Sequence, residues 1–309
     1  MESSRGFKIA VSGSSGLIGS ALVDALAGHG HDVLRLVRRP EAAEGEVSWD
    51  PSAHELDPAA LAGVDTVVHL AGAGIGDKRW TPAYKAKILA SRVDSTQTLS
   101  QALAAAPEAD RPRALLSMSA TGYYGDTGER VVDETDGPGT GFLAEVTRAW
   151  EDATAPAEAA GVRVVVLRTG PVLSAAAGFL GRMLPLARLA LLSPLGSGRQ
   201  YVPWISLADH VAAMEFLLTA DAVSGPVNLT GPDPVPIAEL TDTLLRVLGR
   251  PRLAPRVPAV ALRLALGDFA DEGVLTGQRA VPRVLEAAGH EFAHPTVESA
   301  LRWATDRPA

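Results

Sequence analysis

The sequence predicts an α/β fold, in which a doubly wound parallel sheet carries helices on both faces and a smaller C-terminal part follows. Three observations predict it. Strand and helix patterns alternate along the first 170 residues, a glycine-rich turn follows the first expected strand, and a stretch rich in proline and arginine interrupts the second half at 251–258. Repeated strand–helix–strand units form parallel sheets, because each helix returns the chain to the same edge of the sheet.

Buried strands are expected where short apolar, β-branched runs are bounded by turn residues. In the first half these runs are residues 7–12, 32–37, 65–70, 114–119 and 162–168. The helical patterns between them are residues 17–27, a short segment at 56–61, 82–106 and 142–160. Thr81 and Pro82 mark the start of the longest helix, since threonine caps helices and proline suits their first position.

The second half is less regular. Short strands are expected at 202–205 and 227–229, and helices at 207–218 and 237–248. A small helical segment follows the break at 251–258, and a tail runs from 281 to 303.

Composition excludes several classes of function. The 309 residues carry a formal net charge of −8, which gives no general affinity for nucleic acid or for an anionic membrane surface. The chain has no cysteine, which excludes disulfides, thiolate nucleophiles and cysteine-bound metals. The apolar stretches 162–172 and 184–195 are too short to span a bilayer, and the polar start 1–6 is unlike a signal peptide. We therefore expect a cytoplasmic protein.

Three catalytic motifs are also excluded. His290 and His294 have the spacing of a zinc-protease helix, but Pro295 disfavours helical backbone at His294, so we expect no metal site. No lysine follows a glycine, as a nucleotide-binding P-loop requires, and no G-x-S-x-G elbow of a hydrolase occurs.

A glycine-rich turn joins the first expected strand to the first helix. Gly13, Gly16 and Gly19 suit a tight turn, the close approach of a pyrophosphate, and close packing of helix on strand. Helix N-termini also offer free N–H groups and a positive dipole end to phosphate. The sequence therefore predicts a Rossmann-like dinucleotide site, with Ser15, Leu17 and Ile18 as further contacts.

The end of the second strand bears on the choice of dinucleotide. An NAD site usually has Asp or Glu there, to bind the ribose 2′-hydroxyl. This strand ends instead in Arg38 and Arg39, and guanidinium groups bind phosphate through charge-assisted hydrogen bonds. We therefore expect NADP(H), which carries a 2′-phosphate.

Beyond these features, the chain resembles an atypical extended short-chain dehydrogenase/reductase. Within that superfamily it is similar to the NAD-dependent epimerase/dehydratase-like family, also called nucleoside-diphosphate-sugar-epimerase-like, which carries a small extra C-terminal domain. Some of its members are labelled cell-division inhibitors. The matching stretches are 13–19, 69–72, 79–82, 91–93, 117–125, 142–145, 167–170, 196–200, 204–205 and 277–282.

The resemblance implies a domain organisation. A dinucleotide-binding domain would cover residues 1–170, with 204–230 returning to it. Residues 171–309 would lie mostly on the substrate side, with the extra domain at about 255–303.

The resemblance also implies a cofactor path along the carboxyl ends of the strands. The segment 70–72 would pass the adenosine ribose, Ser117 and Ser119 would lie under the nicotinamide, and the segment 168–172 would pass its carboxamide. The implied cofactor residues are Leu70, Ala71, Gly72, Arg92, Ser117, Arg168, Gly170 and Val172.

Catalytic members of the superfamily use a Tyr-x-x-x-Lys pair, in which the lysine lowers the pKa of the tyrosine. None of the four tyrosines here has a lysine four residues later, and the aligned positions are Phe142 and Val146. The substitutes that we predict are Ser119, for which Ala120 and Thr121 are alternatives, and as proton-handling groups Tyr123, Tyr124 and Glu145.

A substrate segment is implied at 196–200 and at Trp204. Sugar-nucleotide enzymes commonly have an Arg-Asp pair just before the aromatic residue, where this chain has Val202 and Pro203. Arg199 and Trp204 are therefore expected to contact a small-molecule substrate of unidentified class, through an anionic group at Arg199.

Two functions remain as hypotheses. One is an NADP(H)-dependent oxidoreductase or epimerase acting on a small substrate. The other is a non-catalytic NADP(H)-binding protein that senses redox state or binds a partner. A nicotinamide pocket lined by Ser119 and a tyrosine would favour the enzyme, and one filled by Phe142 and Trp204 would favour binding alone. The resemblance also implies a homodimer through the helices that follow the strands 65–70 and 114–119.

Overall fold

The computed structural model describes residues 6–306 and confirms the α/β fold with a parallel central sheet. Residues 1–5 and 307–309 lie outside the described residues. They include the outer ends of both expected domains and most of the segment 1–6, which was compared with a signal peptide. The seven-stranded sheet has the order β11-β7-β5-β4-β1-β2-β3, and all neighbours are parallel. Its strands are β1 Lys8–Ser12, β2 Asp32–Val37, β3 Glu46–Ser48, β4 Thr66–His69, β5 Ala114–Ala120, β7 Arg163–Thr169 and β11 Gly225–Leu229.

The strand order reverses between β1 and β4. From β1 the chain runs outward through β2 to β3 and then returns to the other side of β1 as β4. In open α/β sheets, ligands bind outside the carboxyl ends of the strands at such a reversal. The topology therefore puts the candidate site beside the glycine-rich turn.

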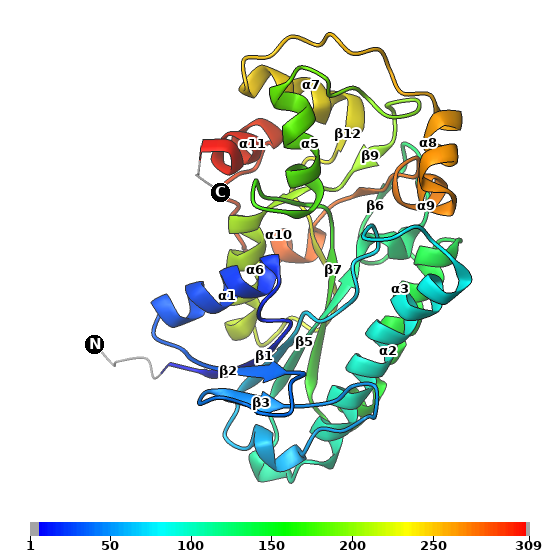
Figure 1. Ribbon diagram of the computed structural model, residues 1–309. Helices are drawn as coiled ribbons and strands as arrows, with labels where there is room; N and C mark the ends of the chain where they lie inside the picture. Colours follow the sequence, from blue (N-terminus) through cyan, green and yellow to red (C-terminus); the bar gives the residue numbers. More distant parts are fainter. Residues whose placement is uncertain (1–5, 307–309) are drawn as a thin grey trace.

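Helices cover both faces of the sheet (Figure 1). On one face α1 Leu17–Gly28 and α6 Leu207–Thr219 pack on apolar strand residues such as Val11 and Leu167. On the other face lie α2 Pro82–Ala105, α3 Phe142–Asp152 and α4 Ala155–Ala159. Because strand side chains alternate between faces, the polar side chains of Ser117 and Ser119 share a face, and Ser119 reaches α3 on that side.

The C-terminal part lies at the carboxyl edge of the sheet, in the upper part of Figure 1. One group of elements shares a core around the fully buried Trp204. It comprises α5 Gly178–Arg188, α7 Ile237–Val247, α11 Val297–Asp306, β8 Val172–Leu173, β9 Tyr201–Val202 and β12 Val235–Pro236. The strand β10 Ile205–Ser206 pairs with β8, and its Ile205 belongs to the core of the sheet. The remaining elements are α8 Ala259–Leu266, α9 Asp268–Gly273, α10 Arg283–Ala287, and β13 Arg279–Ala280, which pairs with β6 Val131–Val132.

Several elements differ from the sequence-based expectations. The expected helix at 142–160 is two helices, α3 and α4, with Pro156 in the first turn of the second. The expected strand at 202–205 is split into β9 and β10. The structure also contains β3 and α5, which the sequence pattern did not predict. The helix α5 contains Pro185, and proline is unfavourable in the interior of a helix. The short segment at 56–61 forms a 3₁₀ turn, η1 Pro58–Leu61.

The region expected to carry no metal site is not helical. Residues 290–294 form irregular chain, in which His290 lies against the rings of Phe216 and Phe292. His294 instead contacts Ser206 and Asp209 near the start of α6. Within residues 6–306, every helix is too short or too polar to cross a bilayer.

Candidate functional site

The glycine-rich turn is built around two close backbone approaches. Gly13 has φ +69°, and a Cβ atom there would lie 2.9 Å from the carbonyl of Leu70 at the end of β4. A Cβ atom on Gly19 would lie 2.2 Å from the carbonyl oxygen of Gly13, so only glycine lets α1 pack this closely on the turn. Both positions require glycine for the geometry of the turn itself.

The same turn leaves room at the start of α1. A Cβ atom on Gly16 would meet only the carbonyl oxygen of Gly13, at 3.4 Å. No side chain caps α1, and its first turn holds no acidic residue. The N–H groups of the first turn of α1 are therefore free of a side-chain cap. Ser15 beside them is exposed, and Leu17 and Ile18 are partly exposed. The geometry therefore fits a phosphate group at this helix N-terminus.

A buried hydrogen-bond chain fixes the two strand ends beneath the turn. Ser12 Oγ lies 2.6 Å from His69 Nδ1, and His69 Nε2 lies 3.1 Å from Ser95 Oγ on α2. Ser12 Oγ also accepts the N–H of Leu70 at 3.2 Å. Burial lowers the pKa of His69 to about 3, so this imidazole is neutral at physiological pH. The chain is thus a structural support for the segment 70–72.

The two arginines after β2 have different surroundings. Arg39 pairs with Glu46 on β3, and its Nε donates to the carbonyl of Glu41 at 3.1 Å. Glu46 has a lowered pKa, through the N–H of Ala43 first and then Arg39. Arg38 is exposed and has no hydrogen-bond or ion-pair partner within residues 6–306. Of the two, Arg38 is the guanidinium that is free to bind a phosphate.

A buried ion pair holds the end of β5, the strand that carries Ser119. Ser119 Oγ donates to Glu151 Oε1 on α3 at 2.7 Å. Arg168, whose side chain is 4% exposed, donates to the same carboxylate through Nε at 3.0 Å and Nη2 at 2.9 Å. Ser119 is itself 2% exposed. The Ser119 hydroxyl donates its only O–H to Glu151, so toward any other group Ser119 can act only as a hydrogen-bond acceptor.

The tyrosine pair divides into a buried and an open member. Tyr124 donates to Asn228 Oδ1 at 2.8 Å and accepts from Arg168 Nη1 at 3.1 Å. Burial raises the pKa of Tyr124 to about 12, so it is a poor proton donor. Tyr123 is partly exposed, and its ring centroid lies 3.5 Å from the guanidinium carbon of Arg168. The Tyr123 hydroxyl has no hydrogen-bond partner in the described chain, so the geometry favours Tyr123 as the proton-handling group.

The other expected residues lie in varied surroundings. Glu145 is exposed on α3, away from the Ser119 network. Ser117 is buried and its Oγ is without a partner in the described chain. Gly170 lies against the carbonyl of Pro203, and Val172 is paired with Ile205 in β8 and β10. The segment 203–205 therefore covers Gly170 and Val172, which limits what these two can offer a cofactor.

The position aligned with the superfamily's tyrosine is part of an aromatic cluster. The ring of Phe142 packs edge-on against Trp80 with 5.1 Å between centroids, and the ring of Phe269 on α9 lies tilted against Trp80 at 5.4 Å. Lys85 lies over Phe142 at 5.3 Å and pairs with Asp268 at 2.6 Å. The cluster joins the C-terminal part to the start of α3.

Glu272 of α9 caps α3. Its two carboxylate oxygens accept the N–H groups of Phe142 and Leu143 at 3.1 and 3.2 Å. A carboxylate at a helix N-terminus satisfies free N–H groups and favours the helix dipole. The start of α3, which carries the catalytic tyrosine in the superfamily, is therefore occupied here by a carboxylate of the C-terminal part.

The two expected substrate residues differ in exposure. Trp204 is fully buried, and its Nε1 donates to the carbonyl of Asp233 at 3.0 Å, so it has no surface for a substrate. Trp204 and Phe142 belong to separate hydrophobic clusters and do not jointly fill one pocket. Arg199 is exposed and pairs with Glu129 at 2.7 Å.

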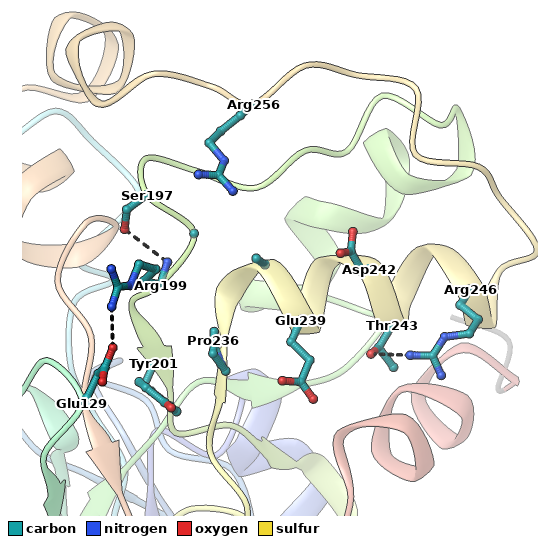
Figure 2. A pocket seen from close by; sticks show the side chains of 12 residues that line it. Glu129, Ser197, Arg199, Tyr201, Pro236, Glu239, Asp242, Thr243, Arg246 and Arg256 are labelled. Carbon is teal, nitrogen blue, oxygen red and sulfur yellow. Dashed lines mark hydrogen bonds and ion pairs between the residues drawn. The ribbon is translucent and has the colours of Figure 1, made fainter.

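Arg199 lines an open cavity of about 450 Å³ beside β9 and α7 (Figure 2). Both acidic and basic side chains line it: Glu129, Glu239, Asp242, Arg199, Arg246 and Arg256. Among the site residues expected from the sequence, Arg199 is the one that lines this cavity in the described chain. The cavity is thus set apart from the glycine-rich turn.

Sequence reasoning missed Glu151 and Glu272. Glu151 lies nine residues after Phe142, and no local motif distinguishes it from the exposed Glu145 of the same helix. The one signal for it was Arg168, a charged residue at the end of a buried strand that needs a counter-charge. Glu272 is 130 positions from its partner Phe142, so no local pattern could reveal the contact.

Comparison with known proteins gives consistent matches over the whole chain. The model of the NAD dependent epimerase/dehydratase family matches residues 9–229, and that of a domain of unknown function (DUF1731) matches residues 257–304. The chain is 52% identical over 300 residues to Epimerase family protein Mb2239 of Mycobacterium bovis, covering 97% of this chain and 98% of the relative.

Two solved structures are also similar. Human epimerase family protein SDR39U1 (isoform2) with NADPH has a TM-score of 0.87 at 30% identity, over 98% of this chain and 100% of that one. The nucleoside-diphosphate sugar epimerase from Corynebacterium glutamicum has a TM-score of 0.77 at 34% identity, over 96% of this chain and 59% of that one.

Proposed function

The chain belongs to the NAD dependent epimerase/dehydratase family, and from this premise we propose that it is an NADP(H)-dependent oxidoreductase or epimerase of a small substrate. The observation that carries the choice of NADP(H) is Arg38. It is an exposed guanidinium without a partner in the described chain, at the end of β2, where an NAD site usually has a carboxylate. The human relative, whose structure contains NADPH, supports the same choice.

The residues present fit a dinucleotide. The open space over Gly16 and the uncapped start of α1 would receive the pyrophosphate. The segment 70–72, held by Ser12 and His69, would border the ribose, and Arg38 would bind the 2′-phosphate. The nicotinamide of such a cofactor supplies a hydride donor or acceptor.

The chain's own groups would handle the accompanying proton. As the phenol, Tyr123 would give its proton to a carbonyl oxygen that is being reduced. In the opposite direction it would start as the phenolate and take the proton from a hydroxyl that is being oxidised. Arg168 keeps a positive charge against the Tyr123 ring, and Glu151 holds Arg168 in place with two hydrogen bonds. Ser119 would accept a hydrogen bond from a substrate hydroxyl, because its own O–H already donates to Glu151.

The test begins with fluorescence titration of NADPH and NADH. We expect NADPH to bind at least about tenfold more tightly, a difference that charge-assisted hydrogen bonds to one phosphate supply. Arg38→Gln should remove this preference, whereas Arg39→Gln should keep most of it. Equal affinities of the unmodified chain for both nucleotides would refute the choice of NADP(H).

Turnover is tested separately, with NADPH and a panel of carbonyl compounds and nucleotide sugars. We expect Tyr123→Phe to lower kcat about 100-fold with little change in the affinity for NADPH. An unchanged kcat would exclude Tyr123 as the proton-handling group.

A second function, non-catalytic NADP(H) binding for redox sensing or partner binding, is favoured by one observation. Phe142 occupies the position of the superfamily's tyrosine, packed under Trp80, and Glu272 occupies the N-terminus of its helix. Tight NADPH binding with no turnover by any member of the panel would favour this second function.

We further propose that the chain acts as a homodimer through α2 and α3, which sedimentation of the purified protein would test.

A further inference from the structure

Exposed apolar side chains are concentrated in two segments of the C-terminal part. Eight large apolar side chains are exposed within residues 6–306, and six of them lie in the segments 186–191 and 253–264. Each of the six is between 46% and 75% exposed: Leu186, Leu189, Leu191, Leu253, Val260 and Leu264. Single exposed leucines are common on proteins, whereas a contiguous group of them marks a binding surface.

The two segments lie side by side. The N–H of Gly196 donates to the carbonyl of Val257 at 2.9 Å, and the N–H of Val257 donates to the carbonyl of Pro194 at 3.2 Å. Ser193 Oγ also donates to the carbonyl of Pro255 at 2.6 Å. The second segment then crosses the top of the molecule in Figure 1 and continues into α8. Segments far apart in the sequence therefore contribute their leucines to one region.

The backbone holds these side chains outward. Val260 and Leu264 are one turn apart on α8, so they share the exposed side of that helix. Ala190 has φ +57°, a left-handed conformation that is unfavourable for any residue with a Cβ atom. Ala190 is buried, while its neighbours Leu189 and Leu191 are exposed. The chain thus adopts an unfavourable conformation between two exposed leucines.

Arginine is the only charged residue type in these parts of the chain. Residues 178–200 and 243–267 contain eight arginines and no lysine, aspartate or glutamate, although the whole chain has a formal net charge of −8. The negative net charge therefore conceals an uneven distribution. Arg188, Arg250 and Arg256 are exposed and have no hydrogen-bond or ion-pair partner in the described chain. We call residues 186–191 and 250–264 together the leucine–arginine surface.

An open hollow of about 540 Å³ adjoins the leucine–arginine surface. Its lining has three guanidinium groups and one carboxylate: Asp242, Leu245, Arg246, Arg250 and Arg252. Arg252 pairs with Asp242 at 3.0 Å and Arg246 with Glu298 at 2.7 Å. Both ion pairs are exposed, and such pairs contribute little, so another anion can replace their carboxylates. The hollow therefore suits a phosphate group.

The charges distinguish between the partners that this surface could bind. In a two-fold dimer the same patch of a second copy would lie against it, so Arg250 and Arg256 would face like charges. Nucleic acid would supply phosphates, but its sugar–phosphate surface offers little to aliphatic side chains. An anionic lipid surface supplies both phosphates and an apolar layer beneath them.

We propose that the leucine–arginine surface binds the surface of an anionic lipid membrane. The exposed leucines would enter the boundary between headgroups and acyl chains, and the arginines would bind lipid phosphates, which their long side chains can reach. The membrane affinity would come from buried apolar area and electrostatic attraction together. This inference does not depend on the proposed binding of NADP(H).

The test is flotation of the full chain with vesicles of phosphatidylcholine alone, or with phosphatidylglycerol added at a ratio of about 2:1. One variant combines Leu253→Gln with Leu264→Gln, and a second combines Arg250→Gln with Arg256→Gln. The matched controls lie outside the surface. Val131→Thr replaces an exposed apolar residue of β6, and Arg148→Gln an exposed arginine of α3 without a partner in the described residues.

We expect the unmodified protein to bind the anionic vesicles and not those of phosphatidylcholine alone. The leucine variant should bind about 10- to 100-fold more weakly, since two leucines no longer enter the apolar layer. The arginine variant should bind about 10- to 30-fold more weakly, and raising NaCl from roughly 0.05 to 0.5 M should weaken the unmodified protein. Both controls should stay within about twofold, and all variants should keep their melting temperature, because the replaced side chains are exposed.

Four results would overturn the inference. The unmodified protein could fail to bind anionic vesicles, it could bind phosphatidylcholine equally well, or both variants could bind like their controls. The fourth concerns a second copy: sedimentation without lipid could show a dimer that the leucine variant dissociates, in which case the surface is an interface between copies. If the leucine variant melts at a lower temperature, the arginine variant decides. Loss of NADPH binding by the unmodified protein would overturn the proposed function and leave this inference standing.

Discussion

Replacing Glu151 by glutamine is expected to destabilise the protein by about 3 kcal/mol. Glu151 accepts hydrogen bonds from Ser119 at 2.7 Å and from Arg168 at 3.0 and 2.9 Å. Glutamine keeps one acceptor oxygen, turns an N–H group toward the guanidinium, and leaves the charge of Arg168 unpaired. Removing one partner of a buried pair costs about 3–5 kcal/mol. The lower figure applies because the Glu151 side chain is 14% exposed, against 4% for Arg168.

The assay is urea unfolding followed by tryptophan fluorescence, with thermal melting beside it. A loss of about 3 kcal/mol corresponds to a melting temperature lower by roughly 6 °C for a chain of this size. Glu145→Gln is the matched control on the same helix, because Glu145 is exposed and has no partner within residues 6–306. Its effect should stay within about 0.5 kcal/mol.

A double replacement separates the ion pair from the packing. Glu151→Leu combined with Arg168→Met should cost far less than the two single changes added together, because an apolar pair leaves no charge unpaired. The reasoning is refuted if Glu151→Gln destabilises no more than Glu145→Gln, or if the double change is simply additive.

Three further outcomes are expected. Glu46→Gln should tighten NADPH binding by a few-fold, about fivefold at most, by releasing Arg39; titration would contradict this if a second change, Arg39→Gln, left the gain intact. Glu272→Gln should cost about 1 kcal/mol of unfolding free energy, since α3 loses its charged cap; an unchanged urea midpoint would count against the cap. His69 and His210 are fully buried, and burial lowers the pKa of each from 6.5 to about 3. Because the unfolded chain then binds more protons, the stability present above pH 6.5 should fall as the pH drops toward 3, as urea midpoints at pH 7 and 5 would show; a His210→Gln variant with the same pH dependence would argue against this assignment.

Much of the sheet could be predicted from the sequence, because its signals are local. A buried parallel strand is a short apolar run, and the turn around Gly13 has a spacing that the packing of helix on strand imposes. The same holds for α2, where Thr81 accepts the N–H of Tyr84 at 3.2 Å as a threonine cap should. These elements were found at nearly their observed bounds.

The missed elements depend on tertiary contacts. The strand β3 has three residues and forms beside β2 at the edge of the sheet, so its own pattern is too short to recognise. The helix α5 contains Pro185 and is held by the core around Trp204. That core also explains why Trp204, expected at a substrate surface, is buried: the sequence shows an aromatic residue but not the Gly231 backbone packed against its ring.

The candidate site was predicted unevenly for the same reason. The turn, Arg38 and the tyrosine pair follow from motifs, whereas the preference for Tyr123 over Tyr124 depends on Asn228 and Arg168, which only the fold brings together. That Arg39 is paired with Glu46 likewise depends on β3. A sequence shows that an arginine is charged, but only the fold shows whether a carboxylate such as Glu46 is paired with it.

The cap that Glu272 places on α3 has a consequence for how the chain folds. Residues 142 and 272 are 130 positions apart, so the first turn of α3 lacks its cap until the ribosome has made the extra domain. At about 5–20 residues per second, that delay is roughly 6–26 s, far longer than the formation of a helix. During this interval the strands β1 to β7 can pair while the start of α3 frays. A fragment that ends after β11, the last strand of the sheet, would lack Glu272, so the first turn of its α3 would stay without this cap.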